Sequence, residues 1–221
     1  MSDVKASKSA TRIAVWDPVV RYGHWLLVVA FGAAYLTAEE EGGGAELVHV
    51  WAGYIVGVIV VMRLLWGFVG PERARFRDFV YGPVTTVRYL ADLLRGRARR
   101  YLGHSPAGGA MVVLLLLSLT ATVVTGLITY GDRGKGPLAD SGTPFVAAAY
   151  ADEDISGPRR DFGMRRNGKD AESAVGEVHS ALANITLALV LLHILGVSVA
   201  SVVHRENLVI AMIDGRKRRD G

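Results

Sequence analysis

Four long apolar segments, separated by charged stretches, constrain the fold of this chain more than any other feature. Each reaches the length of roughly 20 residues that a helix needs to cross the hydrocarbon core of a bilayer. Of the 221 residues, 51% are hydrophobic, and they are grouped into blocks, unlike the even spread of a water-soluble domain. The sequence therefore predicts an all-α integral membrane protein, a four-helix bundle that forms one domain over residues 1–221, with spans at about 19–38, 47–69, 110–130 and 177–203.

Lysine and arginine residues beside the spans indicate the orientation. They gather in the N-terminal tail, in the connection between spans 2 and 3, and in the C-terminal "GRKRRDG", whereas the first connection, "AEEEGGGAE", has none. Because basic flanks stay in the cytoplasm, both termini are predicted to lie inside. The basic runs would then meet the anionic head groups of the lipid bilayer, so nucleic acid is not an expected partner.

Two connections have features of their own. "YGPVTTVRYLADLLRGRARRYLG" places Val84, Val87, Leu90 and Leu94 at helical spacing, which predicts a short interfacial helix on the inner leaflet. The long connection between spans 3 and 4 mixes seven basic with eight acidic residues and is rich in Gly and Pro. It is predicted to be an irregular periplasmic loop with one or two helical turns at "PFVAAAY". Such a loop is either a docking surface for a partner or a tolerated insertion.

The chain contains no cysteine. This excludes thiolate-held iron–sulfur clusters, covalently attached c-type haem and disulfides. Any redox or metal chemistry must therefore depend on histidine and oxygen ligands.

Three of the six histidines, His179, His193 and His204, fall in or at the end of the last apolar segment. A lone histidine within a membrane span is commonly a packed, hydrogen-bonded residue. However, at about 100° per residue, the 14 residues from His179 to His193 bring the side chain back to within about 40° of the same face, roughly 21 Å further along the helix. His204 shares that face, but would lie about 37 Å along, beyond a hydrocarbon core about 30 Å thick. It belongs to the interface, as does His104.

The depth of each remaining histidine in the membrane indicates which histidine of the last span it can contact. His49 lies in the first turn of the second span, at the outer end, where it can meet His179. His24 lies roughly 21 Å below the outer end of the first span, the same drop that separates His193 from His179. The sequence therefore predicts two facing pairs, His49 with His179 and His24 with His193.

Two imidazole pairs could hold zinc, relay protons or bind two haems. Structural zinc needs four ligands, and a proton relay within the membrane usually includes buried acids, which these spans lack. Haem fits best.

Gly53, Gly57, Gly126 and Gly196 would leave room for a porphyrin, although Gly53 and Gly57 also fit a helix-packing motif. Arg21 and Arg63 are candidate partners of the propionates, or cations that reach toward the lipid head groups.

Five motifs resemble the bacterial cytochrome b561 family, which includes the b-type cytochrome subunits of nickel–iron hydrogenases. They are "VWDPVVRYGHWLL", "VHVWAGY", "RLLWGFVGPERARF", "GHSPAGG" and "EVHSALANITLALVLLHILG". The resemblance runs from Trp16 to the C-terminus, and the long third connection departs from the family pattern. It implies a multi-pass protein of the bacterial inner membrane with two haem b groups, each held by histidines of helices one and four or two and four.

What the resemblance implies for function is electron transfer between a periplasmic redox partner, a c-type cytochrome or another redox subunit, and the quinone pool, with ubiquinone or menaquinone as substrate. Two histidines per iron leave no open coordination position, which favours electron transfer over oxygen activation. Some family members oxidise superoxide at the outer face and reduce quinone, and the basic residues of the third connection could attract that anion. A scaffold without haem would require all four paired histidines to be accidental.

Overall fold

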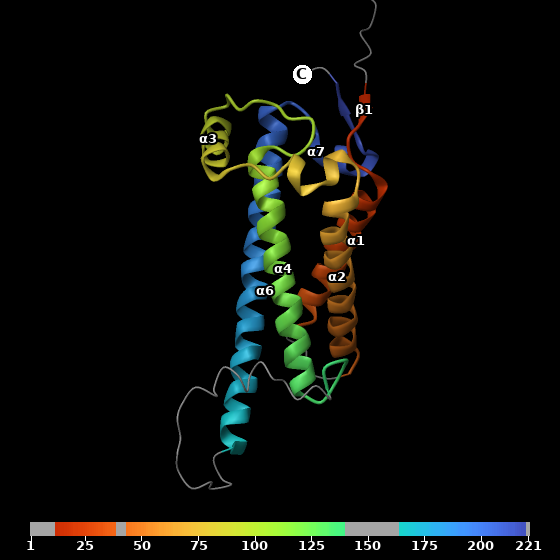
Figure 1. The fold of residues 1–221 in the computed structure, drawn as a ribbon, viewed down its shortest axis with the longest axis vertical. Helices are drawn as coiled ribbons and strands as arrows, with labels where there is room; N and C mark the ends of the chain where they lie inside the picture. The colour runs from red at the N-terminus through yellow and green to blue at the C-terminus, as the bar shows by residue number, and fades with distance from the viewer. Residues whose placement is uncertain (1–11, 39–42, 140–163, 220–221) are drawn as a thin grey trace, which may run out of the picture. The chain divides into compact units, whose positions relative to one another are not determined.

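The computed structural model describes residues 12–38, 43–139 and 164–219, with side chains from residue 174 onward in the last range. It is predominantly helical (Figure 1). In chain order, its elements are β1 (Arg12–Ala14), α1 (Pro18–Leu36), α2 (Gly44–Val69), the 3-10 turns η1 (Glu72–Ala74) and η2 (Phe76–Asp78), α3 (Pro83–Leu94), α4 (Pro106–Asp132), α6 (Met164–Val203), α7 (Leu208–Asp214) and β2 (Arg216–Arg218).

Four of these helices, α1, α2, α4 and α6, are long and apolar enough to cross a membrane. Few residues are buried in the most hydrophobic 18-residue stretch of each helix. The buried share is 6% in α1 and in α6, 11% in α4 and 28% in α2. Aliphatic side chains such as Val29, Leu117 and Leu195 are exposed instead. This outward apolar surface is what a lipid solvent requires, because within a bilayer the hydrophobic effect no longer drives such side chains inward.

The helix boundaries differ from the predicted spans for local reasons. Helix α4 begins at Pro106, before residue 110, because Ser105 Oγ accepts a hydrogen bond from Gly108 N at 3.2 Å and proline at the first helical position has no N–H to leave unpaired. Helix α6 begins at Met164, before residue 177. The hydropathy of the sequence identifies only the part of a helix that lies in lipid, so the polar first turns were not predicted. Residues 164–176 contain no proline, so the helix can continue through them.

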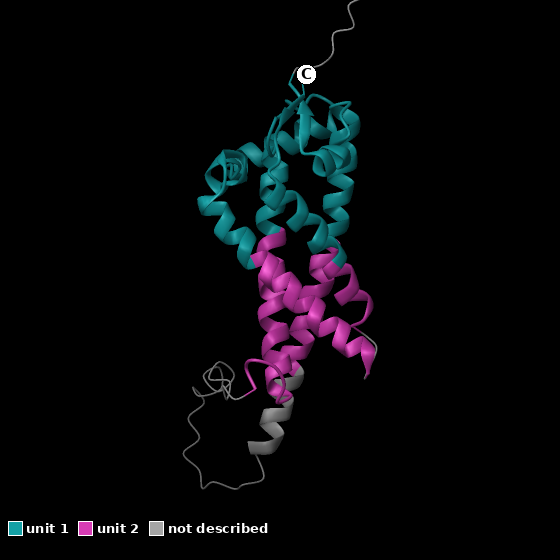
Figure 2. Ribbon diagram, turned by 90° about the vertical axis from the view of Figure 1, so that its right-hand side faces the viewer, with its two compact units in different colours: residues 1–29, 61–114, 190–221 teal, residues 30–60, 115–189 magenta. Residues whose placement is uncertain are grey.

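The chain divides into two compact units, each described by itself (Figure 2). Unit 1 comprises Met1–Val29, Val61–Leu114 and Val190–Gly221, and unit 2 comprises Ala30–Val60 and Leu115–Leu189. Each unit contains one segment of every long helix. A single domain over the whole chain stays a prediction.

In unit 1, the two ends of the described chain pair as a small sheet. Strands β1 and β2 are antiparallel, with Ile13 opposite Lys217. Helix α7 leads into β2: the Asn207 side chain accepts a hydrogen bond from Ile210 N at 2.9 Å, and Gly215, at φ 78°, ends the helix. Neither the strands nor α7 had been predicted from the sequence, so the all-α description is incomplete.

A buried ion pair lies beside these strands. Arg100 donates to the two carboxylate oxygens of Glu206 at 2.9 and 3.1 Å, and the side chains are 17% and 8% exposed. The backbone N–H of Arg218 also donates to Glu206, and the Arg218 carbonyl accepts from Arg100. Burial raises the pKa of Glu206, but the hydrogen bonds from Arg100 and Arg218 outweigh it, so the pKa lies below its ordinary value.

We expect Arg100→Ala to lower the free energy of unfolding by about 3–5 kcal/mol, because it leaves a buried carboxylate without its cation. Unfolding in detergent, followed by the loss of helical circular dichroism, measures this change. Since a lowered pKa contributes stability above the ordinary value of 4.5 that is lost as pH falls through the folded-state value, the difference from the wild type should shrink in acid. The matched control is Arg12→Ala, which breaks the more exposed pair with Asp214 and should cost less than about 1 kcal/mol. Equal effects of the two variants would contradict this account.

Helix α3 is present where the connection between spans 2 and 3 predicted a helix. Tyr89 and Leu93 are buried, while Val84, Val87 and Leu94 are exposed. Tyr89 Oη lies 3.2 Å from His204 Nε2. The exposed apolar side suits a membrane surface, and its position on the inner leaflet stays a prediction. The helical turns predicted at "PFVAAAY" lie outside the described residues.

In unit 2, hydroxyl groups and small residues join the long helices. Ser118 Oγ and Thr186 Oγ1 are hydrogen-bonded at 2.6 Å between α4 and α6, and Thr186 is fully buried. Tyr35 of α1 donates to Asn184 of α6 at 2.7 Å. A Cβ at Gly57 would lie 3.1 Å from Val123, so the absence of a side chain at this position permits close packing of α2 against α4.

Candidate functional site

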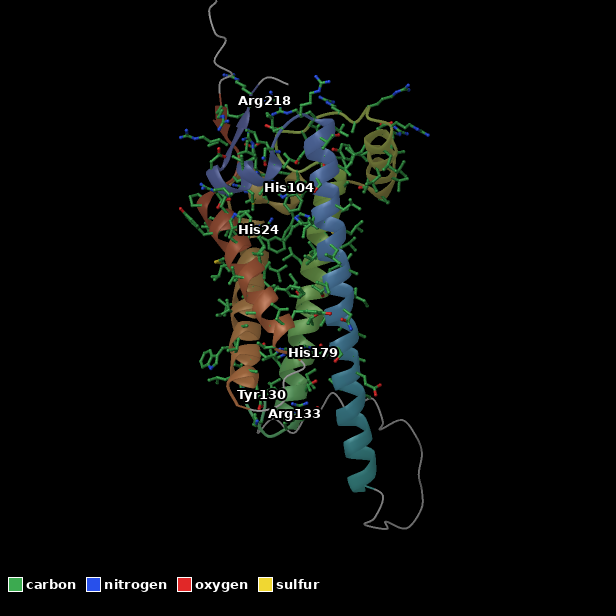
Figure 3. The ribbon with its side chains drawn as sticks, turned by 180° about the vertical axis from the view of Figure 1, so that it is seen from behind. His24, His104, Tyr130, Arg133, His179 and Arg218 are labelled. Carbon is green, nitrogen blue, oxygen red and sulfur yellow. The ribbon has the colours of Figure 1, made fainter. Side chains whose placement is uncertain are left out.

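Within unit 1, the imidazole of His24 on α1, labelled in Figure 3, and that of His193 on α6 form a pair. Their ring centroids are 6.4 Å apart and the ring planes are inclined at 59°. His24 Nδ1 is buried and has no hydrogen-bond partner among the described residues. The structure therefore brings together the two residues that the depth argument paired.

Within unit 2, His49 of α2 and His179 of α6 form a second pair, with ring centroids 6.2 Å apart and planes inclined at 85°. Each of these rings is held by a backbone carbonyl. His49 Nδ1 donates to the carbonyl of Ala34 on α1 at 2.8 Å, and His179 Nδ1 donates to that of Thr122 on α4 at 2.9 Å. A carbonyl can only accept, so Nδ1 carries the proton and Nε2 keeps its lone pair. Metal-binding histidines have this arrangement.

The spacing of both pairs can be compared with that of two imidazoles bound to one metal ion. A metal–imidazole bond is about 2.0–2.1 Å and the bonded nitrogen lies about 1.1 Å from the ring centroid, so two axial imidazoles place their centroids about 6.3 Å apart. The observed 6.4 and 6.2 Å agree with this value. Both pairs therefore fit a metal ion between the rings.

Gly126 of α4 makes the position of His179 possible. A Cβ at residue 126 would lie 2.9 Å from His179 Cε1 and 3.2 Å from Nδ1, closer than carbon atoms approach without displacement. The missing side chain lets the imidazole reach the Thr122 carbonyl. The sequence had suggested Gly126 as room for a porphyrin, whereas in the structure the imidazole of His179 lies against this glycine.

The other candidate glycines separate into two kinds. Gly53, one helical turn after His49 on α2, and Gly196, close to His193 on α6, have no atom within 4 Å of an added Cβ. Gly57 instead packs against Val123. The open space beside Gly53, on the face that carries His49, is where a flat ring system could lie.

The two candidate cations, both in unit 1, have different surroundings. Arg21 donates to the Ile213 carbonyl at the end of α7. Arg63 Nη1 is buried without a hydrogen-bond partner among the described residues, and Arg63 Cζ lies 5.4 and 5.6 Å from the ring centroids of Phe76 and Phe79. Both side chains therefore have a buried nitrogen without a partner among the described residues, Arg21 Nε and Arg63 Nη1, but Arg21 also donates to the protein through Nη2.

Asp17 belongs to the first of the family motifs, and although no role was predicted for it, it fixes the start of α1. Its Oδ1 accepts from Val19 N at 3.0 Å, from Val20 N at 3.2 Å and from Trp66 Nε1 at 3.2 Å. The signal was available, because an aspartate before a proline is a typical helix start. Asp17 thereby sets the position of His24 two turns later.

His104 and His204, both predicted at the interface, differ in their contacts. His104, labelled in Figure 3, packs against Trp16 and Phe79, with centroid distances of 4.6 and 4.4 Å. Its Nδ1 is buried without a partner among the described residues. Burial, followed by the charge of Arg63, lowers the pKa of His104 to about 3. His204 instead lies beside the Tyr89 hydroxyl.

Comparison with known proteins gives several relatives. The chain is 25% identical to the probable Ni/Fe-hydrogenase B-type cytochrome subunit of Azotobacter chroococcum mcd 1, over 60% of this chain and 66% of that protein. The corresponding subunit of Escherichia coli strain K12, named for hydrogenase 1, is 23% identical over 55% and 61%, and that of Bradyrhizobium diazoefficiens is 27% identical over 56% and 60%. The chain thus spans less than two thirds of the length of these relatives. No solved structure matches.

The family comparison covers more of the chain. The family model described as prokaryotic cytochrome b561 matches residues 15–215, a range that includes all four paired histidines. Together with four apolar helices, this match identifies a multi-pass membrane protein of a b-type cytochrome family. The chain belongs to the prokaryotic cytochrome b561 family.

Proposed function

We propose that this protein is a di-haem b-type cytochrome that transfers electrons between a periplasmic redox partner and the quinone pool of the bacterial inner membrane. The observation that carries the proposal is the spacing of the two histidine pairs, each of which fits one metal ion held by two axial imidazoles. Family membership supports haem b as the group that they bind.

Each pair would hold one haem. His24 and His193 would hold one haem in unit 1, where Arg63 would partner a propionate, and His49 and His179 would hold the other in unit 2, where Gly53 would leave room for the macrocycle. When bound, haem b supplies a one-electron redox couple without an open coordination position. At the depths predicted from the sequence, the two haems would lie at different levels of the membrane and would give a path between its faces.

The protein's own groups would tune that couple. The Ala34 and Thr122 carbonyls hold the Nδ1 protons of His49 and His179 and so orient the rings and strengthen their Nε2 lone pairs as ligands. The surrounding apolar side chains exclude water, which influences the reduction potential. No acid or base within the spans is needed for transfer of an electron alone.

Two features support the choice of partners. The relatives are named as probable Ni/Fe-hydrogenase cytochrome subunits, which supports a redox subunit as the electron donor or acceptor. For quinone, unit 1 contains a cavity of about 210 Å³ that the aromatic residues Phe79, Tyr81 and Tyr101 help to line. The charged residues Glu72, Arg73 and Asp78 also line it, and its volume is below the roughly 300 Å³ of common small-molecule sites, so it supports a quinone site less than the relatives support a redox subunit.

Superoxide oxidation receives less support from the described residues. A funnel for an anion requires unpaired positive charge. Lys135, one of the basic residues that follow α4, forms an ion pair with Glu46 at 2.7 Å. This contact reduces the positive charge available at Lys135, and the names of the relatives favour electron transfer with a protein partner.

Rapid reduction of the purified protein tests the proposed function. Quinol should reduce both haems, and a reduced periplasmic c-type cytochrome or hydrogenase small subunit should exchange electrons with them faster than superoxide does. Absorbance of the haem bands in a stopped-flow instrument measures both rates. Faster reduction by superoxide than by any protein donor would favour the oxidase instead.

Gly53→Leu separates a haem-binding role of this glycine from helix packing. No atom lies within 4 Å of an added Cβ, so the apoprotein should keep its stability, while the leucine side chain should exclude the haem bound by His49 and His179. Haem content per chain and thermal unfolding of the apoprotein measure the two effects. Lower apoprotein stability with unchanged haem content would show that Gly53 serves packing alone.

A further inference from the structure

Among the described residues of unit 1, buried side-chain nitrogens without hydrogen-bond partners gather on four residues, Arg21, His24, Arg63 and His104. A buried polar group without a partner costs free energy, and every atom in this set is a nitrogen. The two guanidinium nitrogens, Arg21 Nε and Arg63 Nη1, are donors that lack an acceptor, and an imidazole Nδ1 lacks one when it carries the proton. His24 belongs to a candidate haem site, and Arg21 has another donor engaged with Ile213, which leaves Arg63 and His104 to explain.

Arg63 and His104 contact the same aromatic ring. Arg63 Cζ is 5.6 Å from the centroid of Phe79, and the His104 ring is 4.4 Å from it. The carboxylate of Asp17 attracts Arg63 electrostatically, but its Oδ1 accepts hydrogen bonds from Trp66 and from the first turn of α1. Among the described side chains, no carboxylate forms an ion pair with Arg63. Both groups therefore contact Phe79, and the positive charge of Arg63 also acts on His104. The buried Arg63 Nη1 has no acceptor among the described residues.

We propose that Arg63 and His104 together form a carboxylate site that binds a propionate of the haem held between His24 and His193. This inference depends on the proposed function and adds His104 to the haem site. The planar guanidinium suits a carboxylate. The low pKa of His104 keeps the ring neutral near pH 7, so it has one N–H to donate, and burial reduces screening of the contacts by water.

The test compares haem b with haem b dimethyl ester, whose propionates are blocked. Full-length protein carrying His179→Ala, which should retain only the haem of the His24–His193 pair, is prepared in haem-deficient cells and titrated with either compound. We expect haem b to bind at least about tenfold more tightly, as charge-assisted hydrogen bonds to a buried carboxylate require.

Two substitutions then remove the proposed contacts. His104→Phe keeps an aromatic ring between Trp16 and Phe79 but has no N–H, and Arg63→Met keeps the aliphatic stem without the charge. Each should reduce the preference for haem b over its ester several-fold, and Arg63→Met should also lower the midpoint potential, because a cation near haem favours the reduced state. Thermal unfolding of each apoprotein provides a readout that is independent of haem: neither variant should be less stable than its parent.

The matched control is His204→Phe. His204 is also near the end of α6, but it contacts the Tyr89 hydroxyl, so this variant should keep the full preference for haem b. If the parent binds both compounds equally, or if His104→Phe keeps the preference of the parent, the carboxylate site is wrong while the haem proposal stands. If the parent binds neither compound, the proposed function fails and this inference fails with it.

Discussion

Replacing His193 by alanine should reduce the haem content of the purified protein from two per chain to one. The ring centroids of His193 and His24 in unit 1 are 6.4 Å apart. Without His193, a single imidazole remains for this haem and one coordination position of the iron is open, so a low-spin haem is not held. The His49–His179 pair belongs to unit 2 and keeps both ligands. Pyridine haemochrome analysis gives the haem content, and a redox titration should show one component where the wild type shows two.

The control for this variant is His204→Ala, which removes another histidine near the end of α6. His204 contacts Tyr89 and no other imidazole in the described structure, so both haems should remain. Retention of both spectral components in His193→Ala would reject the assigned pairing. Loss of both haems would show that the two sites do not bind haem independently.

Gly126→Ala should have the second large effect, although it adds only one methyl group. The new Cβ would lie 2.9 Å from His179 Cε1, so the ring must move, and it would lose both its hydrogen bond to the Thr122 carbonyl and its direction toward His49. Because partners that orient a metal ligand commonly change metal affinity by about 10–100-fold, we expect the haem of the His49–His179 pair to be lost during purification while the other remains.

Gly176→Ala provides the matched comparison. Gly176 lies one turn before His179 on α6, and a Cβ there would be 3.9 Å from Thr129 Cγ2, an ordinary van der Waals distance. This variant should keep two haems with unchanged spectra. If Gly126→Ala retained both haems with the wild-type spectrum, the close approach of His179 to α4 would not matter for ligation.

The sequence predicted the long helices and the candidate pairs because both follow from regular helix geometry. Hydropathy located four spans that the structure places in α1, α2, α4 and α6. The rise and turn of a helix were sufficient to place His179 and His193 at different depths on one face. Their assignment as haem ligands stays a prediction, which the variants above test.

The remaining features depend on tertiary contacts that leave no periodic signal. The Ala34 and Thr122 carbonyls that hold His49 and His179 are backbone atoms, which any residue would supply. The strands β1 and β2 have three residues each and pair across almost the whole chain, so alternation could not reveal them. The role of Gly126 requires knowledge of which ring faces it.

His104 shows the same limitation. It was predicted to lie at an interface, but its packing against Trp16 and Phe79 joins residues that are far apart in the sequence. Asp17, by contrast, could have been predicted, since its role as a helix cap is local.

The most direct test of the central claim is electron paramagnetic resonance of the oxidised, purified protein, combined with its iron and haem content per chain. The account predicts two haem b groups per chain, both low-spin with two axial histidines, one signal disappearing in His193→Ala and the other in His179→Ala. A protein that contains no haem, or haem whose low-spin signals persist in both variants, would contradict it.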